Sequence, residues 1–343
     1  MKIDKTSTQL VKIYTRPNWA KCDTNIYTST LKQELECESR RKESSVEERI
    51  KLLEKSIHKA GKKSIPKYRQ LKSLKTVGKG KLNTGKASDE NGIVSEHYIH
   101  AIDVITDEIT DIINQIFEEL DVPQSLKNGI LTPVLKKKKD KTIPGNYRGI
   151  VVTSIFSKIF ETIIKDRLEP ELFPSQNTLQ RGFTEGASSL FTAFIVSETT
   201  MLYKFLKIVL ELLTLDAEKA FDTVTHEIML NKMFHDGIRG DMWVLLKNIY
   251  TNMTLQVKWG DQTTQHVNIQ QGIRQGAKLS TLLYKRYNNT ILNAITGSHL
   301  GAKIGTICVA SPTCADDIAL LGEPQDIYKQ CSILLNSIQR ETW

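Results

Sequence analysis

The stretch CADDIALL, residues 314–321, sets two adjacent carboxylates, Asp316 and Asp317, directly before an apolar run. A second acidic site, Asp216, follows the apolar residues of KIVLELLTLDAEKAF at 207–221. Each site is therefore expected at the end of a buried strand, where carboxylates are costly unless positive charge neutralises them. Two Mg²⁺ ions would do so, because hard cations take oxygen ligands and paired metals clamp the oxygens of a phosphoryl displacement. The function depends on whether these aspartates meet in space.

Composition is that of a globular protein. The chain has 343 residues, 40% hydrophobic and 25% charged, enough for two or three subdomains. The polar N-terminus shows no secretory signal, and the strongest apolar stretch, 205–215, is too short to span a bilayer. The sequence thus predicts an intracellular protein without a membrane segment and leaves nucleus or cytoplasm open. The five cysteines are scattered, which favours reduced thiols, and His97 and His100 are interpreted as surface residues.

The positive charge is concentrated in one segment. The net charge is +8, yet residues 55–88 hold ten lysines, one arginine and no acidic residue, a local charge of +11. Such a segment is typical of a polyanion-binding surface. A solvated, flexible linker explains the charge equally well, so both interpretations stay open.

Hydrophobic spacing predicts a mixture of helices and short strands. A capping-box pattern at Ser44 and Ser45 introduces the first amphipathic helix, and residues 1–43 show little periodicity. Helices are expected at 46–57, 101–120, 155–168, 225–235, 241–250, 279–295 and from Pro324 onward. Strand pairs are expected within 129–152, around the turn at 260–261, and around Asp316 and Asp317. Because strands and helices do not alternate regularly, the fold class is predicted as α+β.

Six motifs, one of them a hairpin in two pieces, carry a family resemblance through their order. They are GKASDENGIVSEH (85–97), the hairpin pieces LTPVLKK and NYRGI (131–137 and 146–150), LQRGFTEGASS (179–189), TLDAEKAFD (214–222), GIRQGAKLSTLLY (272–284) and CADDIALL (314–321). Together they resemble the reverse transcriptases of non-LTR retrotransposons, the long-interspersed-element type. The resemblance implies right-hand polymerase fingers and palm, with an antiparallel palm sheet packed on helices. It places a reverse transcriptase domain at 81–343, after an N-terminal helical and basic linker region at 1–80.

The resemblance also implies roles for individual residues. Asp216, Asp316 and Asp317 would be the catalytic metal ligands for two Mg²⁺ ions, for which Mn²⁺ is a possible substitute. The substrate-binding residues would be Lys136 and Arg148 for the triphosphate, Phe221 beside the incoming sugar, and Gln275 and Gly276 against the nascent base pair. The implied reaction is RNA-directed DNA synthesis, in which dNTPs are added to the 3′-hydroxyl of a DNA primer on an RNA template.

Two features of the sequence favour an alternative. The chain stops at Trp343, soon after the second catalytic motif, so the thumb is expected to be missing and the polymerase to be truncated. Several motif positions depart from the common family pattern, among them Cys314, Gly149, Thr184, Lys278 and Thr281, but none of these departures removes a metal ligand. The second feature is the basic segment, which is expected to bind nucleic acid whether or not catalysis takes place. A catalytically inactive nucleic-acid-binding remnant is therefore the second hypothesis. The sequence does not indicate the oligomeric state.

Overall fold

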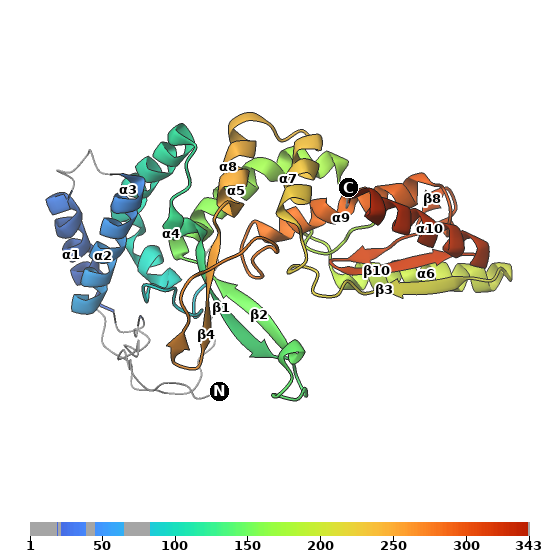
Figure 1. Ribbon diagram of the computed structural model, residues 1–343, viewed down its shortest axis with the longest axis horizontal. Coiled ribbons are helices and arrows are strands. Elements are labelled where there is room, and N and C mark those ends of the chain that lie inside the picture. Colours follow the sequence, from blue (N-terminus) through green and yellow to red (C-terminus); the bar gives the residue numbers. More distant parts are fainter. Residues whose placement is uncertain (1–18, 20–21, 39–44, 65–82, 342–343) are drawn as a thin grey trace. The chain divides into compact units, whose positions relative to one another are not determined.

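The structure, a computed structural model, describes residues 19, 22–38, 45–64 and 83–341 (Figure 1). It divides into two compact units. The described part of Met1–Phe160 and Val244–Ile269 form the first, and Glu161–Trp243 and the described part of Gln270–Trp343 form the second. We call them the fingers unit and the palm unit. No helix in this described portion is long and apolar enough to cross a membrane.

Three helices form one side of the fingers unit: α1 (Thr24–Glu38), α2 (Val46–Ser64) and α3 (Ser95–Glu119). The predicted capping box is confirmed, since the Ser45 amide donates to Glu48 at 3.2 Å and the Glu48 amide donates to the Ser45 hydroxyl at 3.4 Å. Apolar side chains at helical spacing then form the buried face of each helix. They include Ile50, Leu53 and Ile57 of α2 and Ile105, Ile112 and Ile116 of α3.

Two expectations for this region were wrong. Residues 24–38 were not predicted as a helix, yet α1 forms and packs on α2 and α3. His97 was interpreted as a surface residue, yet it is 2% exposed. Its backbone carbonyl accepts a hydrogen bond from the Tyr27 hydroxyl at 2.8 Å, and Trp19 packs edge-on against its ring. The burial of His97 therefore depends on an N-terminal segment whose own sequence shows little pattern.

The fingers unit also carries a mixed sheet (Figure 1). Its strands are β1 (Asn128–Leu135), β2 (Tyr147–Val152), β4 (Thr254–Trp259), β5 (Gln262–Thr263) and β6 (Val267–Asn268). The order is β2-β1-β4-β5, with β6 also pairing with β4. The predicted hairpins are confirmed as the antiparallel pairs β1–β2 and β4–β5. The parallel pairing of β1 with β4 joins segments more than a hundred residues apart and was not predicted.

The rest of the fingers unit links these parts, and two helices cross the division between the units. The short helix α4 (Gln124–Lys127) precedes β1, and a 3-10 turn, η2 (Pro144–Asn146), precedes β2. The division falls inside α5 (Ile155–Leu172), which 3-10 turn η3 (Phe173–Ser175) follows, and inside α8 (Gly240–Tyr250). The domain boundary expected near residue 81 stays a prediction.

The palm unit is built on an antiparallel sheet of order β3-β10-β9. These strands are β3 (Glu211–Leu215), β9 (Thr313–Cys314) and β10 (Asp317–Gly322). Around them lie α6 (Ser189–Leu206), α7 (His226–His235), α9 (Ser280–Gly297) and α10 (Pro324–Glu341), and the small hairpin β7 (Lys303–Ile304) with β8 (Ile307–Cys308). The helices predicted at 225–235, 279–295 and from Pro324 are confirmed, whereas α6 was not predicted.

Helices cover both faces of β10, the central strand of this sheet (Figure 1). Successive residues of a strand point to opposite faces, so Leu320 and Leu321 of β10 enter different cores. Leu320 packs with Ile295 of α9 and Ile327 of α10. Leu321 packs with Ala302 and Val309, against which Ile195, Val196 and Tyr203 of α6 also lie. The strand that carries Asp317 at its first position is thus held from both sides.

One apolar surface remains uncovered. Helix α6 and strand β3 expose large hydrophobic side chains that an ordinary surface helix would replace with polar ones. Among the exposed residues are Leu190, Phe194, Met201, Phe205 and Leu212, with exposed fractions of 75%, 59%, 64%, 82% and 53%. We call these five residues the α6–β3 apolar surface.

Candidate active site

Strand pairing brings the two acidic sites of the sequence together. In the antiparallel β3–β10 ladder, Ile318 lies opposite Leu215, so the next positions along the two strands are Asp317 and Asp216. Asp316 precedes Asp317 in the turn between β9 and β10. Burial and the negative charges of Asp316 and Asp216 raise the pKa of Asp317 above its usual range. The three carboxylates are therefore electrostatic neighbours at one end of the palm sheet.

These carboxylates have the right chemistry for hard cations, since such ions prefer oxygen ligands. Their side chains do not form a complete coordination site. Among the residues that the structure describes, no group of three acidic, histidine or cysteine side chains is close enough to hold a metal ion. Asp216 and Asp317 are exposed and Asp316 is half-buried. The three carboxylates are the type of ligand that a divalent cation prefers. That they come together around such a cation stays a prediction.

A side chain from another segment braces the turn that carries Asp316. Gln180, only 2% exposed, donates from Nε2 to the Ala315 carbonyl at 3.0 Å and accepts the Ala315 amide proton on Oε1 at 3.0 Å. The same oxygen accepts the Gly182 amide at 2.9 Å. The backbone continues the contact, because the Arg181 amide donates to the Thr313 carbonyl at 2.8 Å.

The brace needs a glycine at position 182. A Cβ atom there would lie 1.9 Å from the Ala315 nitrogen and 2.5 Å from its Cα, distances that no side chain can adopt. Ala315 itself has a φ of 63°, in the left-handed region that is unfavourable for residues with a Cβ. The close approach of the two backbones and the Gln180 side chain together hold this strained turn.

Phe221 lies within a set of three aromatic rings. Its ring stacks on Tyr284 with centroids 4.9 Å apart and planes at 11°, and Phe183 meets it edge-on at 5.9 Å. Tyr284 is 2% exposed. Burial raises the pKa of the Tyr284 phenol to about 12, and the charges of Asp316 and Asp317 add to this shift. The stack therefore lies near the carboxylates and fixes the plane of the Phe221 ring.

The loop with Gln275 and Gly276 is fastened at its start to the segment after β3. The Ile273 amide donates to the Phe221 carbonyl at 2.8 Å, and the Gly272 amide donates to the Val224 carbonyl at 2.8 Å. Gly272 has a φ of 94°, which glycine adopts readily. Gln275 is half-buried and Gly276 is exposed.

Glu161 fastens the same loop on both sides of Gln275 and Gly276, on one side through a buried ion pair. Arg274 Nη2 lies 2.8 Å from Glu161 Oε1, and both side chains are 2% exposed. The other Glu161 oxygen accepts the Leu279 amide at 3.2 Å, so one carboxylate holds both sides of the Gln275–Gly276 turn. Removing one partner of such a pair leaves a buried charge uncompensated.

Lys136 and Arg148 lie on the β1–β2 hairpin of the fingers unit, as predicted for the hairpin strands. Both side chains are exposed. Lys136 follows β1, its amide donates to the Asn146 carbonyl at 2.8 Å, and Arg148 lies opposite Val134. The structure thus places these two cations on one hairpin. The predicted carboxylates and Phe221, Gln275 and Gly276 belong to the palm unit.

Three contributors to this site were not identified from the sequence: Gln180, Tyr284 and the Glu161–Arg274 pair. The segment LQRGFTEGASS was singled out, but no role was given to its glutamine. Its pairing partner is 135 residues away, so local spacing carries no sign of it. Tyr284 belongs to the run LSTLLY and resembles any core aromatic in the sequence.

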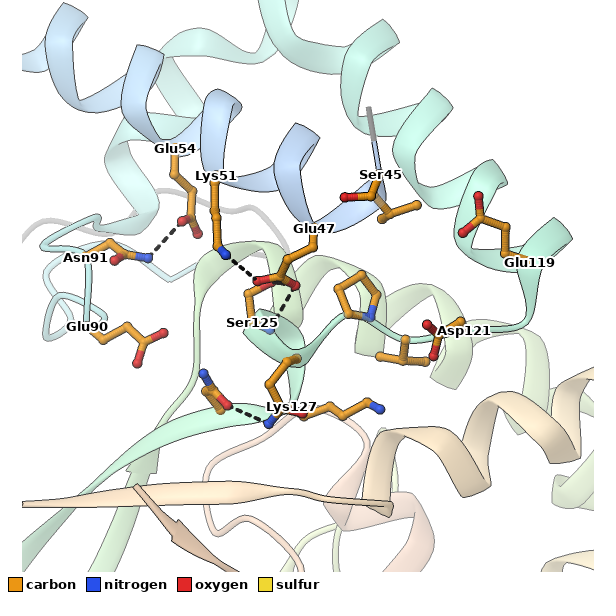
Figure 2. Close-up of a pocket in the computed structure, with 15 residues that line it drawn as sticks. Ser45, Glu47, Lys51, Glu54, Glu90, Asn91, Glu119, Asp121, Ser125 and Lys127 are labelled. Atoms are coloured by element: carbon orange, nitrogen blue, oxygen red, sulfur yellow. Dashed lines mark hydrogen bonds and ion pairs between the residues drawn. The ribbon is translucent and has the colours of Figure 1, made fainter. Parts of the chain in front are cut away.

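A hollow of about 690 Å³ belongs to the fingers unit (Figure 2). Figure 2 shows Glu54 accepting a hydrogen bond from Asn91, and Glu47 contacting both Lys51 and Ser125. The hydrogen bond from Asn91 to Glu54 is 2.8 Å long. Burial and neighbouring acidic groups raise the pKa of Glu54 to about 8. These contacts tie α2 to the chain segments beside it, and the hollow holds none of the predicted site residues.

Comparison with known proteins assigns the family. Residues 135–341 match the family described as "Reverse transcriptase (RNA-dependent DNA polymerase)". The Pol polyprotein of the type-1 retrotransposable element R2 of Popillia japonica is 33% identical over 115 residues, 33% of this chain and 19% of that protein. The transposon TX1 149 kDa protein of Xenopus laevis is 25% identical over 199 residues, 58% of this chain and 15% of that protein.

A third relative is the probable RNA-directed DNA polymerase from transposon X-element of Drosophila melanogaster. It is 28% identical over 184 residues, 53% of this chain and 20% of that protein. The chain thus spans about a fifth or less of the length of these three relatives. Because the family match covers more than half of the chain, the chain belongs to the reverse transcriptase family, with relatives in non-LTR retrotransposons.

Proposed function

We propose that this chain is the polymerase part of a non-LTR retrotransposon protein and extends a DNA primer on an RNA template with dNTPs. The observation that carries the proposal is the β3–β10 register, which sets Asp216 beside the Asp316–Asp317 turn. Three carboxylates at a strand end, in a chain of this family, suit the coordination of divalent cations.

Asp216, Asp316 and Asp317 are the residues that would hold two Mg²⁺ ions, with Mn²⁺ as a possible substitute. Such ions lower the cost of deprotonating the primer 3′-hydroxyl and of the charge on the departing pyrophosphate. The protein itself then contributes position more than covalent chemistry, as in other phosphoryl transfers. The Gln180 brace contributes here, because it fixes the backbone on which Asp316 and Asp317 stand.

The substrate side of the proposal assigns one role to each remaining residue. Lys136 and Arg148 would neutralise the triphosphate, arginine through paired hydrogen bonds and lysine as a point charge. The flat ring of Phe221 would exclude a 2′-hydroxyl, and its stacking on Tyr284 supports this by limiting the movement of the ring. Gln275 and Gly276 would lie against the nascent base pair, where glycine allows close backbone approach.

Primer extension on an RNA template tests the proposal. We expect incorporation of dNTPs by the wild-type chain in Mg²⁺, and no measurable extension by Asp216→Asn or Asp316→Asn. The matched control is Asp241→Asn, which alters an exposed aspartate at the start of α8 and should leave extension unchanged. Binding of primer–template without extension, in both Mg²⁺ and Mn²⁺, would contradict catalysis and favour the inactive binding remnant.

A further inference from the structure

A second hollow, of about 420 Å³, opens on the fingers sheet, and two aromatic rings border it. Tyr147 lies opposite Leu135 at the end of β1, and Trp259 is the last residue of β4 on the other side of that strand. The two rings meet over β1 with centroids 5.3 Å apart and planes at 57°. Pro133 and Leu135 of β1 form part of the lining.

The tryptophan ring is available to a ligand. Trp259 is 59% exposed, although it packs against Tyr147, so much of its surface lies toward solvent. The position of the Tyr147 ring is fixed by a hydrogen bond, because its hydroxyl donates to the Lys141 carbonyl at 2.9 Å. A large aromatic side chain held in place but left open is suited to stacking with another flat ring.

The charge around the hollow is positive. Lys258 belongs to the lining, and none of the described residues that line the hollow is acidic. The tip of the adjacent β1–β2 hairpin, residues 136–141, carries five lysines and one aspartate, all exposed. A ligand of this surface is therefore expected to combine flat rings with negative charge, as nucleic acid does.

We propose that Trp259, supported by Tyr147 and Lys258, is a stacking platform for one base of single-stranded nucleic acid. Inside a duplex the base faces are covered by their neighbours, so along the strand an exposed indole can stack on a base only where that base is unpaired. Lys258, which also lines the hollow, adds positive charge that attracts the phosphates of the bound strand. The identification of this strand as the template rests on the proposed function, whereas the binding itself does not.

Equilibrium binding of a labelled 15-nucleotide RNA without primer, nucleotides or divalent metal tests the platform. Trp259→Ala is expected to weaken binding about tenfold, within the range for loss of one base–aromatic stack. Trp259→Phe keeps a ring and should recover most of the affinity. The matched control, Tyr328→Ala, removes a tyrosine of α10 that is 77% exposed and should bind as wild type.

Two further measurements separate stacking from charge. Lys258→Ala should reduce the slope of log affinity against log salt by about 1, whereas Trp259→Ala should leave that slope unchanged. RNA that lacks its bases should bind wild type and Trp259→Ala equally. Thermal unfolding of each variant identifies any loss of binding that comes from unfolding. If Trp259→Ala is unfolded, the comparison of Trp259→Phe with wild type tests whether a ring at this position supports RNA binding.

Any one of three results would overturn the platform. The first is that Trp259→Ala binds the RNA as tightly as wild type, and the second is that removing the bases from the RNA lowers the affinity of both proteins by the same factor. The third is that wild type binds AMP saturably and as tightly as it binds the RNA. The last would indicate a mononucleotide pocket. The outcome is independent of catalysis. If Trp259→Ala loses RNA affinity and the wild type does not extend a primer, the platform is supported and the polymerase function is contradicted. If Trp259→Ala keeps its RNA affinity and the wild type extends a primer, the platform is contradicted and the polymerase function is supported.

Discussion

The side chain of Gln180 forms hydrogen bonds to both backbone groups of Ala315, which lies 135 residues further along the chain. An amide side chain can do this because it has a donor and an acceptor in one plane. Ala315 is the residue before Asp316 and has a left-handed backbone conformation. The geometry of the acidic turn is thus set by a residue outside it.

Gln180→Glu should therefore weaken the turn. A carboxylate still accepts the Ala315 amide proton, but it cannot donate to the Ala315 carbonyl, and a buried acceptor without its donor costs about 1–3 kcal/mol. We expect the free energy of unfolding to fall by that amount in urea titrations. The Mg²⁺ concentration for half-maximal primer extension should rise as well.

The exposed residue Gln325 of α10 provides the matched control for this substitution. Gln325→Glu adds the same charge without touching the turn, so neither quantity should change. If Gln180→Glu unfolded like wild type and kept the same Mg²⁺ requirement, the brace would have no influence on Asp316 and Asp317.

Sugar selectivity should depend on Tyr284 as well as on Phe221. Tyr284→Leu removes the stacked ring, and aromatic pairs contribute about 0.5–1.5 kcal/mol beyond their buried area. The preference for dNTPs over rNTPs should then fall roughly two- to tenfold. Single-nucleotide incorporation with each sugar measures this ratio, which a general loss of activity would leave unchanged.

Tyr284→Phe serves as the rescue for the previous experiment, because it restores the ring without the hydroxyl. It should discriminate between the two sugars as wild type does. Equal discrimination by the leucine and phenylalanine variants would show that the stack does not control the position of Phe221.

The free energy of unfolding should fall as the pH rises, because Glu54 ionises. Its folded-state pKa is about 8, above the ordinary value of 4.5, because burial disfavours the charge. The folded protein therefore holds the proton more tightly than the unfolded chain, and this contribution is full below pH 4.5 and is lost as the pH rises through 8. Glu54→Gln keeps an acceptor for Asn91 and cannot ionise.

Urea unfolding of wild type and Glu54→Gln at pH 5 and pH 8 measures this effect. We expect the variant to gain at least about 1.4 kcal/mol relative to wild type between the two values, the equivalent of one pKa unit. Glu118→Gln on the exposed side of α3 is the control and should follow wild type at both. If the free energy of unfolding changed equally with pH in all three proteins, the pKa of Glu54 would not be raised in the folded state.

The α6–β3 apolar surface should limit solubility without contributing to stability. Phe205→Glu replaces a side chain that is 82% exposed, so we expect the free energy of unfolding to change by less than about 0.5 kcal/mol. Light scattering at rising protein concentration should decrease, since large exposed apolar patches promote association. Increased scattering, or a substantial loss of stability, would show that Phe205 is buried in solution.

The sequence predicted those parts of the fold whose signal is local. Asp216, Asp316 and Asp317 stand beside apolar runs, and a strand that ends in a carboxylate can be identified without its partner. Helix α6 escaped prediction because it is apolar on most sides, so it lacks the polar face that produces a helical period. Helix α1 was missed because its pattern is weak and its burial depends on α2 and α3.

Long-range contacts account for most of the remaining gap at the site. The contact between Tyr147 and Trp259 exists only because β4 runs parallel to β1, and nothing in either strand specifies that neighbour. The Glu161–Arg274 pair likewise joins a helix to a loop more than a hundred residues later. Spacing along the chain predicts which residues carry the chemistry better than it predicts which residues hold them.

The distance in sequence between Gln180 and Ala315 also governs how the protein can be dissected. A fragment that begins at β3 would contain every acidic residue of the candidate site, yet it would lack the side chain that supports their turn. Asn177, three residues earlier, is tied through its side chain to Asn293 and Thr296 of α9. The smallest piece with an intact acidic turn therefore starts before residue 177, and shorter fragments are unsuitable for measuring metal binding.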